Sequence, residues 1–185
     1  WHGLGNELTP NATIEDWTKE AGLDWEIFES AVMYETASGT KNWNDKRVLF
    51  RSDTNQALSV VGNDYKIVQP QEVLEFFRDL TSLHGMQLSA AGSLFGGKRF
   101  WATAKTGNSF QPVTGDTVDG YLLLVSSADG SLSTSARLTS TRVVCNNTLT
   151  VALHSGSKKL VKKSHRSEWD ATQTKIDMGL VDESW

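Results

Sequence analysis

The sequence predicts an α+β fold, in which antiparallel β-hairpins form a twisted sheet with two or three helices packed on one face. Three observations carry this prediction. Strong turn signals at Phe95-Gly96-Gly97 and Ala128-Asp129-Gly130-Ser131 separate short β-prone runs. The apolar run at 122–125 is typical of a buried strand, and apolar residues between 73 and 80 recur with helical spacing.

Length and composition favour a single domain. The chain has 185 residues, of which 38% are hydrophobic and 22% charged, enough to bury a core without disulfides. We expect an α+β domain over residues 1–156, followed by a basic segment and a C-terminal tail helix over 157–185. No run of about 18 apolar residues is present, so we expect no membrane partner. A single cysteine, Cys145, excludes an intrachain disulfide framework and favours a cytoplasmic location.

In the first half of the chain, Thr13 is a predicted helix N-cap and Gly22 a predicted helix end. Partial alternation of apolar residues predicts a strand over 24–35, and we expect a polar loop over 36–46. Two β-prone runs, 47–53 and 57–61, predict a hairpin.

In the second half, Pro70 opens a predicted helix that ends at Gly85. The stretches 86–94 and 98–105 flank a tight turn and predict a second hairpin. The β-prone stretch 132–144 follows the turn at 128–131, and a short helix is expected over 148–154.

Motifs of known enzyme classes are absent. The sequence contains no phosphate-binding loop, no dinucleotide fingerprint, no zinc-protease motif and no nucleophile elbow. The four histidines show no metal-ligand spacing, and Cys145 is expected to be a buried, small apolar side chain. We therefore expect no catalytic residues, metal or cofactor. Asp116, Asp119 and Asp129 leave a metal-dependent nuclease open as a third choice.

Charge is unevenly distributed along the chain. Residues 1–129 carry a net charge of −7, residues 130–167 carry +7 with no acidic residue, and residues 168–185 carry −4. A charge block of this kind points to an anionic partner. The alternative is a solvated basic loop that pairs with the acidic tail beside it. The candidate nucleic-acid-binding residues in and near the block are Arg137, Arg142, Asn146, Lys158, Lys159, Lys162, Lys163 and Arg166.

A second basic cluster lies at the predicted hairpin. Lys98 and Arg99 stand beside Phe100 and Trp101, which point to opposite faces of a strand, so we expect at most one exposed ring. Cations beside exposed aromatic rings are the combination with which proteins hold single-stranded nucleic acid.

Several stretches resemble one known family. They are Trp1-His2-Gly3-Leu4-Gly5, Ala21-Gly22-Leu23-Asp24-Trp25, Arg51-Ser52-Asp53-Thr54, Ser126 to Gly130, and Arg142-Val143-Val144-Cys145-Asn146-Asn147-Thr148-Leu149. In this order, over about residues 1–155, they are similar to the phage/plasmid-like proteins known as domain of unknown function 932. The resemblance implies carriage by bacteriophages, prophages or plasmids, and hence a bacterial host cell, but it implies no mechanism.

These observations together predict a single-stranded-DNA-binding protein of a mobile genetic element, with strand annealing as a further possibility and with homo-oligomers expected. The alternative is a non-enzymatic counter-defence or host-factor-binding module that uses the acidic part of the chain.

Overall fold

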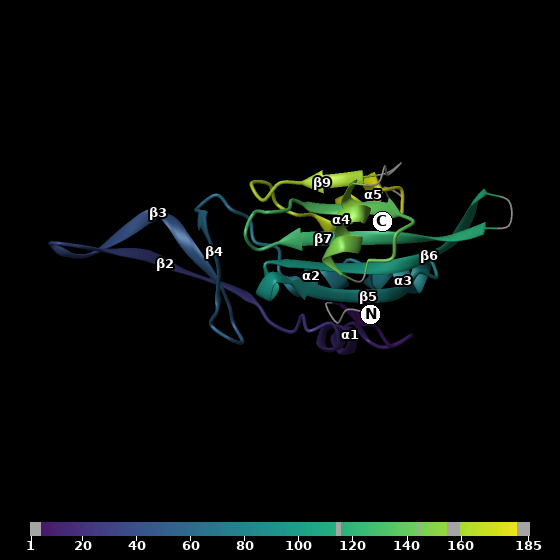
Figure 1. The fold of residues 1–185 in the computed structure, drawn as a ribbon, viewed down its shortest axis with the longest axis horizontal. Helices are drawn as coiled ribbons and strands as arrows, with labels where there is room; N and C mark the ends of the chain where they lie inside the picture. Colours follow the sequence, from purple (N-terminus) through teal and green to yellow (C-terminus); the bar gives the residue numbers. More distant parts are fainter. Residues whose placement is uncertain (1–4, 114–115, 144, 155–159, 181–185) are drawn as a thin grey trace.

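The computed structural model describes residues 5–113, 116–143, 145–154 and 160–180. A six-stranded antiparallel sheet forms the body of the protein, and a separate three-stranded sheet projects from it as a long arm (Figure 1). The strand order of the body is β1-β5-β6-β7-β8-β9. Its strands are β1 (Asn6–Glu7), β5 (Gln87–Leu94), β6 (Arg99–Val113), β7 (Asp116–Ser127), β8 (Thr134–Thr139) and β9 (Leu160–Lys163).

The body sheet is buried on both faces, and the alternation of side chains along its central strands shows how. Phe100 and Ala102 on β6 belong to one core cluster, whereas Trp101 between them belongs to a second. On β7, Leu122 and Leu124 face the first cluster, and Leu123 and Val125 face the second. A strand buried on both sides is a continuous apolar run, which is why 122–125 shows no polar alternation.

Helices cover the two faces unequally. The larger core lies under α1 (Ile14–Glu20), α2 (Pro70–Glu75), α3 (Arg78–Leu83) and α5 (Ala171–Asp177). The smaller core lies under α4 (Asn146–His154), which contributes Leu149 and Ala152. The predicted α+β class with antiparallel hairpins is confirmed, and α4 adds a cover on the second face that the sequence did not predict.

Local sequence signals set the helix ends. The Thr13 side chain accepts a hydrogen bond from the backbone N–H of Asp16, as predicted for an N-cap, and Gly22 follows the C-cap with φ of 67°. Pro70 opens α2 as expected, but the predicted helix over 70–85 is broken at Phe76 and Phe77. Both rings are almost completely buried. Adjacent residues of a continuous helix point about 100° apart, so a break at this point lets both rings enter the core.

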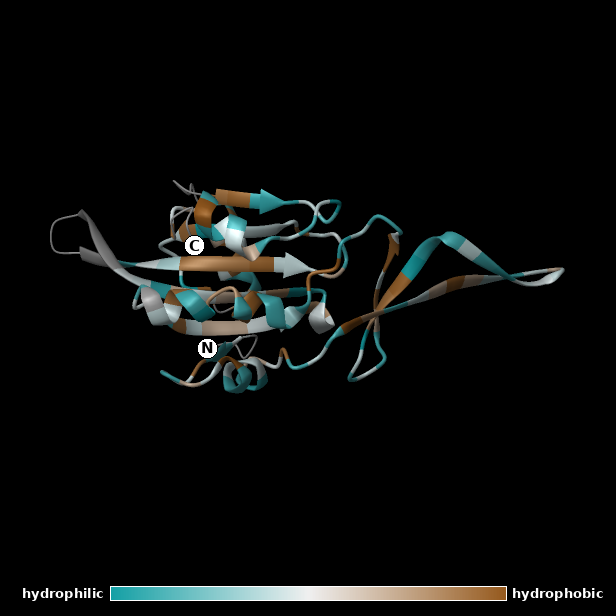
Figure 2. Ribbon diagram, turned by 180° about the vertical axis from the view of Figure 1, so that it is seen from behind, coloured by the Kyte–Doolittle hydropathy of each residue, from teal (hydrophilic) through white to brown (hydrophobic). Residues whose placement is uncertain are grey.

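The arm consists of β2 (Ile27–Thr36), β3 (Gly39–Arg51) and β4 (Ala57–Gly62), with β3 in the middle. The polar loop predicted over 36–46 is therefore wrong: most of it is strand, and β2 turns directly into β3 through Ala37 and Ser38. Backbone pairing with β2 extends the ribbon although its side chains are mostly polar and exposed. Figure 2 shows apolar strands in the body and mixed polar and apolar residues along the arm.

The C-terminal segment is built into the body. β9 pairs antiparallel with β8, and Met178 at the end of α5 enters the larger core. None of the helices in the described ranges is long and apolar enough to cross a membrane.

Candidate nucleic-acid interface

The turn between β5 and β6 carries an exposed aromatic ring on an unusual backbone. Phe95, Gly96 and Gly97 all have positive φ values, of 55°, 71° and 104°. The left-handed region is natural for glycine but costs a residue with a side chain about 1–2 kcal/mol. Phe95 nevertheless occupies it, with 57% of its surface exposed. We call residues Phe95 to Arg99 the Phe95 turn.

The base of the arm holds the Phe95 turn in place. Arg51 on β3 donates from Nη1 to the Gly96 carbonyl at 2.9 Å, and its guanidinium lies 4.2 Å from the Trp25 ring centroid. Asp53 binds the same guanidinium at 2.8 Å, and this hydrogen bond lowers the pKa of the Asp53 carboxyl. A Cβ at Gly97 would lie 2.8 Å from the Trp25 ring, so only glycine fits this contact.

Cationic side chains surround the exposed ring. The Arg99 guanidinium lies 5.3 Å from the Phe95 centroid, and its Nε donates to Ser131 Oγ at 3.0 Å. Lys98 precedes it and is half-buried. Within the described ranges, neither Lys98 nor Arg99 forms an ion pair, and the nearby Asp129 uses its carboxylate to accept from the Ser131 N–H. The turn can therefore offer a ring face and positive charge together.

The two rings that the sequence analysis associated with this basic cluster are not accessible to a ligand. Phe100 and Trp101 are both fully buried, one in each core. The expectation that at most one is exposed holds, but neither can stack on a ligand. The exposed ring is that of Phe95, which precedes two glycines in a turn where a bulky side chain was not expected.

Arg137 was predicted to contact phosphate, and the structure corrects this. Its residue surface is 7% exposed, and Nη1 donates to the carbonyls of Ala152 and Leu153, at 3.1 and 2.5 Å. Burial lowers the pKa of the guanidinium. Arg137 therefore caps the C-terminal end of α4, where the helix dipole favours a cation.

Two further predicted cations contact carboxylates of the chain itself. Arg142 Nη2 lies 2.6 Å from Glu7 Oε1, and Arg166 Nε lies 3.7 Å from Asp64 Oδ2 on an exposed surface. Arg142 is thus a bridge to β1 rather than an open phosphate clamp. Asn146 begins α4, and its Oδ1 is buried without a hydrogen-bond partner among the described residues.

Lys162 is exposed and Lys163 is half-buried on β9, the outer strand of the body. Within the described ranges they form no ion pair. Lys163 is opposite Thr134, and Lys162 is opposite Ser135, which pairs in turn with Val125 and through it with Trp101. Lys162 therefore lies on the sheet face of Trp101 and Arg99, the face that α4 covers, at three strand spacings or about 14 Å from Trp101. Lys158 and Lys159 lie outside the described residues.

Sequence reasoning missed a similar aromatic–cation pair in the arm. Lys46 Nζ lies 5.7 Å from the centroid of the Trp43 ring, which is 46% exposed. The spacing of three residues in a predicted loop gave no signal, because only the folding of β3 brings the two side chains together.

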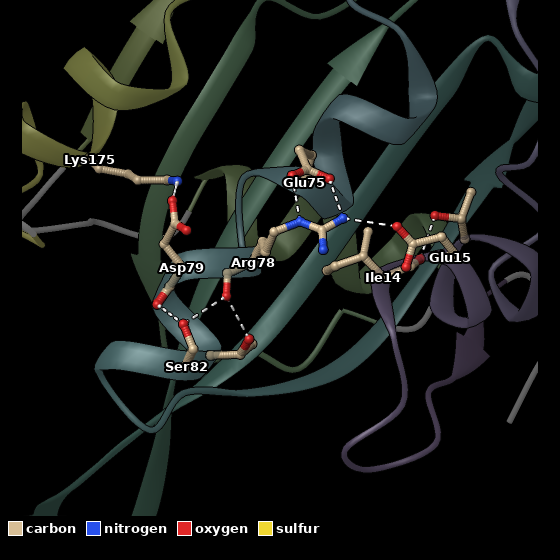
Figure 3. Close-up of polar contacts among 9 residues, drawn as sticks. Ile14, Glu15, Glu75, Arg78, Asp79, Ser82 and Lys175 are labelled. Carbon is tan, nitrogen blue, oxygen red and sulfur yellow. Dashed lines mark hydrogen bonds and ion pairs between the residues drawn. The ribbon is translucent and has the colours of Figure 1, made fainter.

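A groove of about 700 Å³ lies between α1, the end of α3 and the start of β5. Its one arginine, Arg78, is held by Glu75 at 2.6 Å and by Glu15 at 3.1 Å (Figure 3). These ion pairs raise the pKa of Arg78. The pKa of Glu15 is lowered, first by a backbone hydrogen bond and then by Arg78. The groove therefore lacks an open charge with which to recognise a polyanion.

Two of the residues considered for a nuclease, Asp119 and Asp129, bind groups of the chain itself. No group of three or more metal-binding side chains occurs among the described residues. Asp119 pairs with Lys105 at 3.2 Å, Asp129 caps its own turn, and the Asp116 side chain lies outside the described ones. Cys145 is buried as expected, and hydrogen bonding with Thr148 lowers its pKa.

Comparison with family models gives a match over most of the chain. The sequence model of a family described as a domain of unknown function, DUF932, matches residues 57–185, which run from β4 through α5. No curated protein and no solved structure matches the chain.

Proposed function

Because the chain belongs to the DUF932 family, whose description names no activity, the function has to come from the site, and we propose single-stranded DNA binding without catalysis. In this proposal the protein acts in the cytoplasm of a bacterial host, as a product of a mobile genetic element. Strand annealing is the reaction that such binding would serve.

The observation that carries the proposal is the conformation of Phe95. An exposed phenylalanine at positive φ costs stability, and glycine at the same position would remove the cost. Strain of this kind is concentrated where a side chain must be presented to a ligand. Here the ring is held out at the end of the body sheet, under the Arg99 guanidinium.

The chemistry of the surroundings favours a nucleic acid. Stacking of one base on an aromatic side chain contributes about 1–3 kcal/mol and is tolerant of sequence. Lys98 and Arg99 flank the ring, and Lys162 adds an exposed charge on the same side of the sheet as Arg99, about 14 Å across the strands from Trp101. A flexible single strand can place a base on Phe95 and its phosphates along these cations, whereas a rigid duplex keeps its bases stacked.

The test compares variants in fluorescence-anisotropy titrations of a labelled oligothymidine at low salt. Phe95→Gly relieves the strained φ, so the protein stays folded, while affinity should fall by about 5- to 150-fold, corresponding to about 1–3 kcal/mol. Phe95→Trp should keep the affinity. Trp43→Ala removes another exposed ring, in the arm, and serves as the matched control.

Two results would contradict the proposal. One is the absence of binding by the wild-type chain at low salt. The other is a Phe95→Gly variant that binds as tightly as wild type.

A specific observation favours a second function, that of a module that binds a host protein. Phe28, Val48, Phe50 and Val60 lie on one face of the arm sheet, and Phe28 and Val60 are 46% and 55% exposed. Exposed apolar faces mark protein-binding surfaces. Binding of a purified basic host protein that Val60→Lys abolishes, and that Phe95→Gly leaves unchanged, would favour this second function.

A further inference from the structure

The outer edge of the arm is an unprotected β-strand edge. β2 is ten residues long and lies at the edge of its three-stranded sheet, and all of its residues beyond Ile27 are exposed except the half-buried Val32 (Figure 1). An edge strand presents a row of unpaired N–H and C=O groups, which can pair with another chain.

The backbone contacts identify which residues face outward. Gln69 binds both backbone groups of Ile27, donating to its carbonyl at 3.0 Å and accepting from its N–H at 2.7 Å. Ile27 therefore directs these groups away from β3. Since outward and inward residues alternate along an antiparallel edge, Glu29 and Ala31 also face outward. The pairing with β3 shifts register between Ala31 and Met33, and beyond the shift the two-residue turn that pairs Thr36 with Gly39 sets Met33 and Glu35 outward as well. Within the described ranges, no other segment pairs with them.

Both edges of the body sheet carry the usual protection against pairing. In the body sheet, β1 is only two residues long, and β9 is four residues long and includes Lys162 and Lys163. Short length and lysines are devices that prevent edge-to-edge association. β2 contains neither proline, lysine nor arginine, and its first residue alone is capped by Gln69.

We propose that β2 pairs with β2 of a second copy of this chain, antiparallel and about a twofold axis that passes through Ala31. The inference does not depend on DNA binding. It joins the two arms into one continuous six-stranded sheet and places the two bodies at opposite ends.

The sequence of β2 selects this register. Pairing requires outward residues to face outward residues, which allows axes at Ala31, Val32 or Met33. An axis at Val32 sets Glu29 opposite Glu35 twice, which is unfavourable because like charges repel. Axes at Ala31 and at Met33 each pair seven residues of the strand, because Gln69 already occupies the outward groups of Ile27, so the side-chain contacts decide between them.

The register at Ala31 gives the better side-chain contacts. It sets Phe28 opposite Tyr34 of the other copy, on the same face, and both rings are about half exposed in the single chain. Cross-strand aromatic pairs contribute about 0.2–1 kcal/mol each, and the twofold axis produces two of them. It pairs no two carboxylates.

Disulfide trapping tests the register in the full chain with Cys145→Ser. Ala31→Cys would place two thiols across the axis with Cα atoms about 5.5 Å apart, within the range for a disulfide. We expect a covalent dimer under mild oxidation. Glu35→Cys is the control, since its two copies would be offset by eight residues, about 26 Å apart. Equal trapping by both variants, or trapping by neither, would overturn the proposal.

Light scattering tests the association without cysteines. One chain has a mass of 20.4 kDa, and the wild type should approach twice this mass as its concentration rises from about 1 to about 100 µM, since small interfaces are weak. Ala31→Pro removes an outward N–H that β3 does not use, so it should keep the thermal midpoint and remain at the mass of one chain. A wild type that stays monomeric throughout the range sinks the proposal, whatever its affinity for DNA.

Discussion

The guanidinium of Arg137 on β8 donates to the carbonyl of Leu153 at the C-terminal end of α4, at 2.5 Å. This bond connects the smaller helix layer to the sheet, and it uses a charge that the sequence assigned to a ligand. Cationic residues therefore have two different roles in this fold. Arg137 serves the protein itself, and Lys162, on the neighbouring strand, stays in solvent.

Replacement of Arg137 should affect stability rather than DNA binding. Hydrogen bonds that involve a charged group contribute about 1.5–3 kcal/mol each, offset here by the cost of burying the charge. We expect Arg137→Gln to lower the free energy of unfolding by about 1–3 kcal/mol in urea denaturation. Lys162→Gln, at an exposed position, should change it by no more than about 0.5 kcal/mol. Unchanged stability together with weakened oligonucleotide binding would restore the phosphate role.

The contact between Lys175 and Asp79 should show an asymmetry between its two partners. Lys175 Nζ lies 3.2 Å from Asp79 Oδ2 and 5.3 Å from the Phe76 centroid, and its side chain is 5% exposed (Figure 3). Asp79→Asn leaves a buried ammonium without its carboxylate, so we expect a loss of about 2–4 kcal/mol in the free energy of unfolding. Lys175→Met removes the buried charge and keeps the packing, so the loss should stay near 1 kcal/mol.

A double-mutant cycle measured by urea denaturation checks this contact. The Asp79→Asn, Lys175→Met double variant should be no less stable than Asp79→Asn alone. Equal losses for the two single variants would mean that the ammonium is solvated in the folded protein.

The sequence predicted features that depend on local patterns. The structure contains the N-cap at Thr13, the turns at 95–97 and 128–131 and the buried strand at 122–125. Each of these features is specified by adjacent residues or by the spacing of apolar residues along the chain. The continuous helix over 70–85 failed because burial of two adjacent rings overrode the periodic pattern. The loop over 36–46 failed because pairing with a partner strand overrode composition.

The candidate site was less predictable, since it depends on long-range contacts. The sequence shows that Arg137 and Arg142 are charged. It does not show that the C-terminal end of α4 lies over Arg137 or that Glu7 lies beside Arg142. The strained φ of Phe95 depends on Arg51 and Trp25, which are far away in the chain. The one available signal was an aromatic residue directly before two glycines in a predicted turn.

The raised pKa of Tyr65 predicts that the folded protein loses stability at alkaline pH. Its hydroxyl donates to the Ser127 carbonyl at 3.0 Å, its ring stacks on His165, and burial raises its pKa from 10.0 to about 12. Folding thus favours the neutral phenol. The resulting stabilisation is fully present below about pH 10 and is lost as the pH rises towards 12.

Subtracting the tyrosinate titration of Tyr65→Phe from that of the wild type should leave a single transition near pH 12. A midpoint near 10 in the difference curve would mean that Tyr65 is solvated.

Two glycines in the Phe95 turn should respond differently to alanine. A Cβ at Gly96 would meet only the flexible Gln56 side chain, at 3.4 Å, so Gly96→Ala should cost about 1–2 kcal/mol for its positive φ. Gly97→Ala adds a contact of 2.8 Å with the Trp25 ring, and overpacking of this kind costs about 1–3 kcal/mol more. Thermal unfolding measures both. A Gly97→Ala variant no less stable than Gly96→Ala would show that Trp25 moves aside easily.

The salt dependence of binding should report how many cations the strand contacts. If Lys98, Arg99 and Lys162 each neutralise one phosphate, the logarithm of the affinity for a single strand should fall against the logarithm of salt with a slope of about −2. Lys162→Gln should bring the slope to about −1.4 without affecting stacking on Phe95. Arg166→Gln, whose partner Asp64 already offsets its charge, is the matched control and should leave the slope unchanged. A slope that Lys162→Gln does not alter would confine the site to the Phe95 turn, because Lys162 would then release no counterion.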